Sequence, residues 1–426
     1  MTAPEAPGEN DSAPSGSQDT GPGTPLAAPE GQPPSEVEER LMDAKSRMDW
    51  GAYLDVLADT DLFFALPRAL ADEGRTVFTP EWRPEIQAQC LVVYTTAMLP
   101  PPVEDPVFRY GSLGRLAEVW DRNDPPWLAV NPGSPCEAYF PASRAYCALW
   151  AEHAARAPAA DTPRVLTLRT GGPHSGPVAR GLACGALLCA TNHSYWNAVH
   201  WHGTGYPAER RRLEEWWGVT TREKWREYVE ELLRMEMSSP VWDFVLGARR
   251  SMARDFGGHV DTEQWKQTVE RVMWRRATEV EITPEGVTVP EGPDEDELRS
   301  HVEGVKRLIG RIVRYEKRFR ADGLLPEGRF VRSVAAWDLG RASKMARWGL
   351  GARFCSPQEM EDAVVRAGRV SMLEHTSWED FSAGYILGRC LHFDEEEFGS
   401  WYADMLAAHE VLMSDPESPW RTIPFR

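Results

Sequence analysis

The chain has 426 residues, more than the roughly 250–300 that one hydrophobic core supports, so two domains and a tail are expected. A formal net charge of −18 excludes wholesale attraction to nucleic acid or an anionic membrane, since both require a basic face. The sequence has no secretory signal and no window of roughly 20 apolar residues, which predicts a soluble, cytoplasmic protein.

Residues 1–35 are rich in Pro, Gly, Ser and acidic side chains and have almost no large apolar ones. Such a segment cannot bury enough surface to offset its ordering entropy, so a disordered acidic tail is expected. It fits either a solubilising tail or a docking peptide for a partner.

Residues 36–156 alternate between helical and strand patterns, which is typical of a small α/β domain. Helical spacing predicts a first helix or helix pair over Val37–Leu57. Short β-branched or aromatic runs and further helical segments follow it. They predict strands at Thr60–Pro67, Leu91–Thr96 and Trp127–Val130, and helices at Gly114–Trp120 and Pro141–Ala155.

This region resembles the N-terminal domain of the SseB (enhanced serine sensitivity) family. The resemblance rests on the early helix, the Leu62–Pro67 strand, the central Leu91–Thr96 strand and the segment Leu128–Pro135, in which an Asn-Pro pair ends a strand. The resemblance implies a fold and no catalytic site.

Residues 157–178 read as a linker with an edge strand at Arg164–Leu168, and residues 179–426 as a mainly helical domain. The expected fold class is therefore α+β overall. A hairpin or loop interrupts the helical pattern over Glu279–Val289. The predicted helices are Leu182–Tyr195, Thr221–Met235, Thr262–Ala277, Asp294–Arg320, Phe330–Trp348, Ser356–Leu373, Ser377–Leu391 and Glu395–Met413.

Two of these helices carry arginines beside aromatic residues. Trp337, Arg341 and Trp348 share a helix face, and Asp338 is placed to pair with Arg341. Gly384 and Gly388, four residues apart, would let another helix approach the face that carries Tyr385 and Arg389, which predicts that the two helices meet.

Two interpretations of this meeting remain open. In the first, a polar pocket binds an anionic ligand, because guanidinium groups grip phosphate or carboxylate. In the second, buried arginines form a structural network with Asp338, Glu379 or helix carbonyls, with Trp rings packed on top. The candidate ligand-binding residues are Trp337, Asp338, Arg341, Trp348, Trp378, Tyr385 and Arg389.

The second domain, from about Ala179 to Arg426, resembles the domain-of-unknown-function family numbered 1266. That family has no established activity, so the resemblance implies a fold and leaves function open. It rests on Trp217–Glu223, Trp337–Arg341, Arg347–Gly349, Ser377–Phe381, Tyr385–Arg389 and Ser418–Trp420.

The sequence contains no motif typical of metal binding or of nucleophilic catalysis. His193, His200 and His202 are close in sequence, but two helical turns would hold His193 and His200 about 10 Å apart, so neither a metal nor a cofactor is expected. The seven scattered cysteines are expected to be reduced core thiols. Cys355 precedes a helix start, which favours either a thiolate or a merely packed thiol.

The leading functional expectation is a non-enzymatic protein-interaction or accessory factor with a protein partner, without binding nucleic acid or membrane. One version, suggested only by family association, is an accessory factor of a secretion or toxin system. The alternative is an enzyme or sensor that binds an anionic small molecule in the Arg-, Trp- and Tyr-lined pocket.

Overall fold

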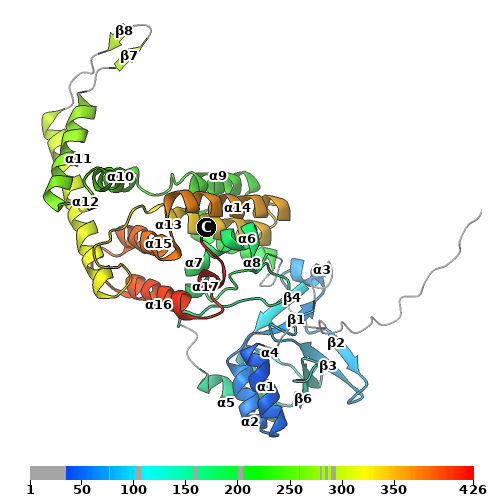
Figure 1. The fold of residues 1–426 in the computed structure, drawn as a ribbon. Coiled ribbons are helices and arrows are strands. Elements are labelled where there is room, and N and C mark those ends of the chain that lie inside the picture. Colours follow the sequence, from blue (N-terminus) through cyan, green and yellow to red (C-terminus); the bar gives the residue numbers. More distant parts are fainter. Residues whose placement is uncertain are drawn as a thin grey trace, which may run out of the picture.

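The computed structural model describes residues 35–75, 77–100, 107–157, 162–199, 205–258, 260–278, 281–283, 286–288 and 294–426. The predicted disordered tail lies outside these residues except for Ser35. Within them the fold is α+β, as expected: small sheets belong to the N-terminal part, and a large helical body follows (Figure 1).

The N-terminal sheet has four strands in the order β2-β3-β5-β6. β3 and β5 run parallel and the outer pairs run antiparallel. A separate antiparallel pair, β1 and β4, meets the end of β3 through a bridge between Phe63 and Tyr94. The strands are β1 (Leu62–Leu66), β2 (Pro80–Arg83), β3 (Ala88–Val93), β4 (Val107–Gly111), β5 (Trp127–Val130) and β6 (Ala138–Pro141).

Helices cover this sheet, and Leu57, Leu91, Leu128 and Trp150 are fully or almost fully buried between the layers. The expected helix pair forms, and the three expected strands are present. Sequence reasoning missed β2, β4, β6 and the short helix α3. The helices are α1 (Glu36–Ser46), α2 (Trp50–Ala58), α3 (Arg68–Asp72), α4 (Leu113–Val119) and α5 (Arg144–Arg156).

The helical body contains one large apolar core, and α11 and α12 extend from it as an arm with the β7–β8 hairpin at the tip (Figure 1). The hairpin strands are β7 (Glu281–Thr283) and β8 (Gly286–Thr288). The helices are α6 (Gly176–Ala183), α7 (Ala186–Thr191), α8 (Tyr206–Trp217), α9 (Arg222–Leu233), α10 (Pro240–Asp255), α11 (Thr262–Ala277), α12 (Glu295–Ala321), α13 (Ala335–Gly351), α14 (Pro357–Glu374), α15 (Trp378–Phe393), α16 (Ser400–Ser414) and α17 (Pro419–Thr422).

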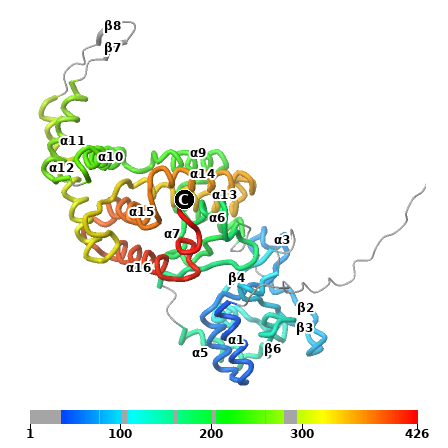
Figure 2. The backbone as a smooth tube through the Cα atoms, viewed as in Figure 1, coloured from blue at the N-terminus to red at the C-terminus, as the bar shows by residue number. Residues whose placement is uncertain are grey.

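Helix α13 lies at the centre of this body, packed against α6, α7, α8, α9, α14 and α15. The chain ends within the same body: α17 packs on α6 and α16, and Arg426 donates to the carbonyls of Met372 and His375 at the end of α14 (Figure 2). Sequence reasoning missed α8 and α10 and read α6 and α7 as one helix. The break between them falls at Cys184 and Gly185.

The two parts of the molecule are joined through a shared aromatic core. Tyr195, which follows α7, packs its ring against Phe63 at 5.5 Å and Tyr110 at 5.4 Å, and its hydroxyl donates to Asp61 at 2.8 Å. The predicted edge strand at Arg164–Leu168 does not form. The Asn197 side chain bonds the backbone N–H and C=O of Leu168 instead, both at 2.8 Å.

Candidate functional site

The candidate site is built on one face of α13, along which Trp337, Arg341, Lys344 and Trp348 follow at three- and four-residue spacing. All four are buried or half-buried. Burial of cationic side chains is costly unless each finds a partner, so their contacts decide what this face can do.

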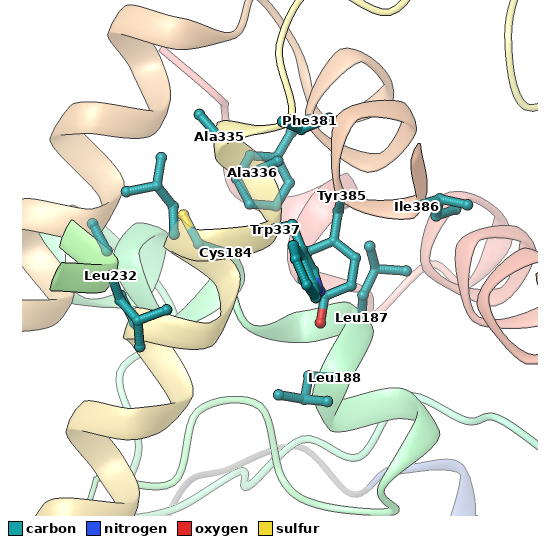
Figure 3. Close-up of a cluster of buried hydrophobic side chains, with 14 of the residues drawn as sticks. Cys184, Leu187, Leu188, Leu232, Ala335, Ala336, Trp337, Phe381, Tyr385 and Ile386 are labelled. Carbon is teal, nitrogen blue, oxygen red and sulfur yellow. The ribbon is translucent and has the colours of Figure 1, made fainter. Parts of the chain in front are cut away.

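Helices α13 and α15 meet as the glycine spacing predicts. A Cβ added at Gly388 would lie 2.8 Å from the Cβ of Trp337, and one at Gly340 would lie 2.6 Å from Cε2 of Tyr385. Only glycine permits so close an approach. Figure 3 shows the result: Trp337 and Tyr385 lie side by side, with the Tyr385 hydroxyl on the side of Leu187 and Leu188 in α7.

Asp338 belongs to a satisfied network. Its carboxylate is fully buried and accepts hydrogen bonds from Ser238, at 2.9 Å from the backbone N–H and 2.8 Å from the hydroxyl. It also accepts a hydrogen bond from Arg341, whose guanidinium lies 3.6 Å from the Trp337 ring centroid. Burial lowers the pKa of Arg341 although Asp338 favours its charged form. Asp338 and Arg341 therefore match the interpretation in which buried arginines form a structural network.

Tyr385 and Arg389 are not satisfied in the same way. The Tyr385 hydroxyl and the Nε of Arg389 are buried and have no hydrogen-bond partner among the described residues. Burial raises the pKa of Tyr385, and the guanidinium groups of Arg389 and Arg341 oppose this rise. The hydroxyl therefore lies within electrostatic range of two cations, and Arg389 also acts on it at close range without meeting the geometry of a hydrogen bond.

Sequence reasoning missed the other half of the site, which α7 supplies. The thiol of Cys189 lies 3.2 Å from a terminal nitrogen of Arg347 and 3.6 Å from Nζ of Lys344, and Lys344 also bonds the Ser194 hydroxyl. Burial opposes ionisation of Cys189, but Lys344 and Arg347 outweigh it and lower its pKa to about 7. Burial lowers the pKa of Lys344 to about 8.

We call these seven residues the α13–α15 cluster: Cys189, Asp338, Arg341, Lys344, Arg347, Tyr385 and Arg389. Four of them are cations, whereas Asp338 is the one carboxylate among them. A second carboxylate, Glu209, acts on Lys344 from α8 but pairs with Arg212 at 2.9 Å. The cluster thus holds an excess of positive charge in a low-dielectric setting.

The other two predicted ligand-binding residues, Trp348 and Trp378, lie outside the α13–α15 cluster. Trp348 lies at the other end of the α13 face, beside Trp216 and Trp217, with Lys344 5.7 Å from its ring. Trp378 starts α15 and stacks on Trp420 at 5.6 Å, so the structure does not bring it to Arg341 or Tyr385. Trp378 belongs to the C-terminal core.

Two further sequence hypotheses are narrowed or left open. Burial raises the pKa of Cys355 to about 12, which favours the packed thiol over the thiolate of the two alternatives at that helix start. His200 and His202 lie outside the described residues. Within the described ranges, no group of three or more His, Cys, Asp or Glu residues is placed to hold a metal ion.

Two cavities lie elsewhere in the helical body. One of about 440 Å³ is lined by Val241, Val305 and Leu308, and another of about 730 Å³ lies beside Arg249 and Phe330. Neither is lined by the α13–α15 cluster.

Comparison with known proteins identifies the helical body. A family model described as a protein of unknown function, DUF1266, matches residues 212–425, half of the chain. No curated protein and no solved structure matches the chain. The resemblance of the N-terminal part to the SseB family remains a prediction. In the portions of the chain that the structure covers, each helix is too short or too polar to span a bilayer.

Proposed function

The chain belongs to the DUF1266 family, and from the geometry of its α13–α15 cluster we propose that the helical body binds a small anionic molecule through a phosphate or carboxylate group. The observation that carries the proposal is the Tyr385 hydroxyl, which is fully buried and unpartnered within electrostatic range of Arg341 and Arg389.

A buried hydroxyl without a partner costs free energy, on the order of 1–3 kcal/mol, and an acceptor supplied by a ligand would remove that cost. Arg389 has the same unused capacity at Nε. An anion that accepted from both groups would also reduce the repulsion among the four cations of the cluster. A cation or a neutral apolar ligand would do neither.

The ring contacts of the two arginines suggest how such a ligand is oriented. The Arg341 guanidinium is held over Trp337, and the Arg389 guanidinium lies 4.8 Å from the centroid of the half-exposed Trp401 ring. Stacked guanidinium groups lose little rotamer freedom on binding, since their planes are already fixed. The site is thereby preorganised for an anion that accepts hydrogen bonds through two oxygens, as a phosphate or a carboxylate does.

The test measures thermal unfolding of the full chain in phosphate, pyrophosphate or citrate, against chloride at equal ionic strength. At 100 times the dissociation constant, a bound anion stabilises the folded state by about 2.7 kcal/mol. We expect such a rise for the wild type and its loss in Arg389→Met and Tyr385→Phe.

Arg366→Met is the matched control, because Arg366 pairs with Glu230 on the surface, away from α15. It should retain the full stabilisation. Equal stabilisation of all variants, or none in the wild type with any of the three anions, would refute the proposal. The non-enzymatic accessory role remains a separate prediction, and capture of a protein partner would support that role instead.

A further inference from the structure

Among the described cysteines, Cys189 is distinguished by its neighbours. We propose that Cys189 and Lys344 are a covalent modification site: a peroxide oxidises the Cys189 thiolate, and the Lys344 amine then bonds to the sulfur. The inference does not depend on the proposed anion, because it uses only groups of the chain and a peroxide.

The two reacting atoms are already in contact. Nζ of Lys344 lies 3.6 Å from the Cys189 sulfur. Hydrogen bonds fix the loop after α7: the Ser194 N–H donates to the Cys189 carbonyl at 3.0 Å, and Arg347 donates to the carbonyls of Tyr195 and Trp196. His193 turns this loop with a left-handed backbone, φ 46°.

Burial alone does not explain why Cys189 should be oxidised before other cysteines, since two of them are just as buried. Cys184 and Cys390 are each 1% exposed, as is Cys189. Burial raises the pKa of Cys184 to about 12 and that of Cys390 further, because no pair of cations contacts either thiol. The thiolate is the reactive form, so Cys189 should react first.

The chemistry balances with one equivalent of hydrogen peroxide. The thiolate sulfur attacks one peroxide oxygen, the O–O bond breaks, and protonation of the departing hydroxide gives water and a sulfenic acid. The neutral Lys344 amine then attacks that sulfur, forming an S–N bond. The S–O bond breaks and the hydroxyl leaves as water with a proton from the amine. Peroxide is reduced, and sulfur is oxidised by two electrons.

The pKa values of the pair suit both steps. Burial lowers the pKa of Lys344 to about 8, so part of the amine is neutral near pH 7.5, where most of Cys189 is ionised. The charged or titratable groups that act on the sulfur are Lys344 and Arg347 from α13 and Tyr385 from α15. Because Cys189 ionises as pH rises through about 7, its oxidation should accelerate between pH 6 and 8.

The experiment treats the full chain with hydrogen peroxide and maps its peptides by mass spectrometry. We expect one linked pair that joins the peptides of Cys189 and Lys344, lighter than their sum by two hydrogens and separated by dithiothreitol. Lys344→Arg keeps a cation beside the sulfur but is a far poorer nucleophile, so Cys189 should then stop at its oxygen acids.

The buried Cys184 and Cys390 serve as internal controls in the same digest. Three results would overturn the proposal: Cys189 remains a free thiol while either control is oxidised, Cys189 forms oxygen acids in the wild type without linkage, or the linked pair has gained oxygen. The wild-type digest decides each of these, so the result does not depend on whether the variant folds.

Discussion

The helical body buries arginines in two places that differ in charge balance. On α10, Arg249 is 4% exposed and its terminal nitrogens donate to Glu316 at 2.9 and 2.5 Å. Its guanidinium lies between the rings of Trp265 and Phe330, at 4.2 and 4.6 Å. At that site Glu316 serves Arg249 and, at 3.9 Å, the half-buried Arg320, whereas the α13–α15 cluster has four cations and Asp338 as its one carboxylate.

A buried arginine does not by itself indicate a ligand. At Arg249 and Glu316, two charge-assisted hydrogen bonds hold helices α10 and α12 together, although the Nε of Arg249 is itself buried without a hydrogen-bond partner. Where cations exceed carboxylates and a hydroxyl is left without a partner, an acceptor is missing. The two sites should therefore respond oppositely to removal of a polar group.

The largest effect is expected at the pair of Arg249 and Glu316. Glu316→Gln removes the charge that compensates Arg249 and should lower the free energy of unfolding by about 3–5 kcal/mol, measured by urea denaturation. The control is Glu230→Gln, whose exposed pair with Arg366 should contribute less than about 1 kcal/mol. Equal losses in the two variants would mean that burial of the Arg249 pair has no energetic weight.

An intermediate effect is expected where α13 and α15 touch. Gly388→Ala places a methyl group 2.8 Å from the Trp337 Cβ, and overpacking of this kind costs about 1–3 kcal/mol. Gly399→Ala is the control, because a Cβ there meets no atom within 4 Å. Urea denaturation of both variants compares them. An unchanged Gly388→Ala midpoint would show that the two helices are not held at this distance.

The smallest effect has the opposite sign. Tyr385→Phe removes a hydroxyl that has no partner, so in the absence of anions the protein should be unchanged or more stable by up to about 1 kcal/mol. Tyr315→Phe is the contrast, because that hydroxyl donates to Asp394 at 3.0 Å and accepts from the Glu396 N–H at 2.8 Å. A loss in Tyr385→Phe as large as in Tyr315→Phe would show that its hydroxyl is satisfied after all.

Helical periodicity and glycine spacing were enough to predict that the faces of Arg341 and Arg389 meet. Both signals are local, since they depend on residues within one helix. The contribution of Cys189 could not be predicted, because it joins Lys344 across 155 positions of sequence. A usable signal was present in Lys344 and Arg347, which continue the cationic spacing of Arg341 along α13.

The pair Trp-Gly occurs at positions 217–218 and 348–349, and tertiary contacts give it a different conformation in each place. Gly218 ends α8 with a left-handed backbone, φ 65°. Gly349, which also follows a Trp, lies inside α13, and a Cβ there would meet the Trp225 ring at 2.0 Å. One glycine serves a turn and the other serves packing. The short strands β2 and β6 were not predicted from the sequence for a related reason: their pairing with β3 and β5 defines them as strands.

The loop that carries Tyr195 determines whether the two parts of the chain can be produced separately. Arg347 on α13 donates a hydrogen bond to the Tyr195 carbonyl, while the Tyr195 ring packs against Phe63 on β1 and Tyr110 on β4. If the two parts were produced separately, with the division anywhere in 157–178, the Tyr195 ring would be exposed to water and Phe63 and Tyr110 would lose its contact. The two parts of the chain therefore share an interface and are not independent domains joined only by a linker.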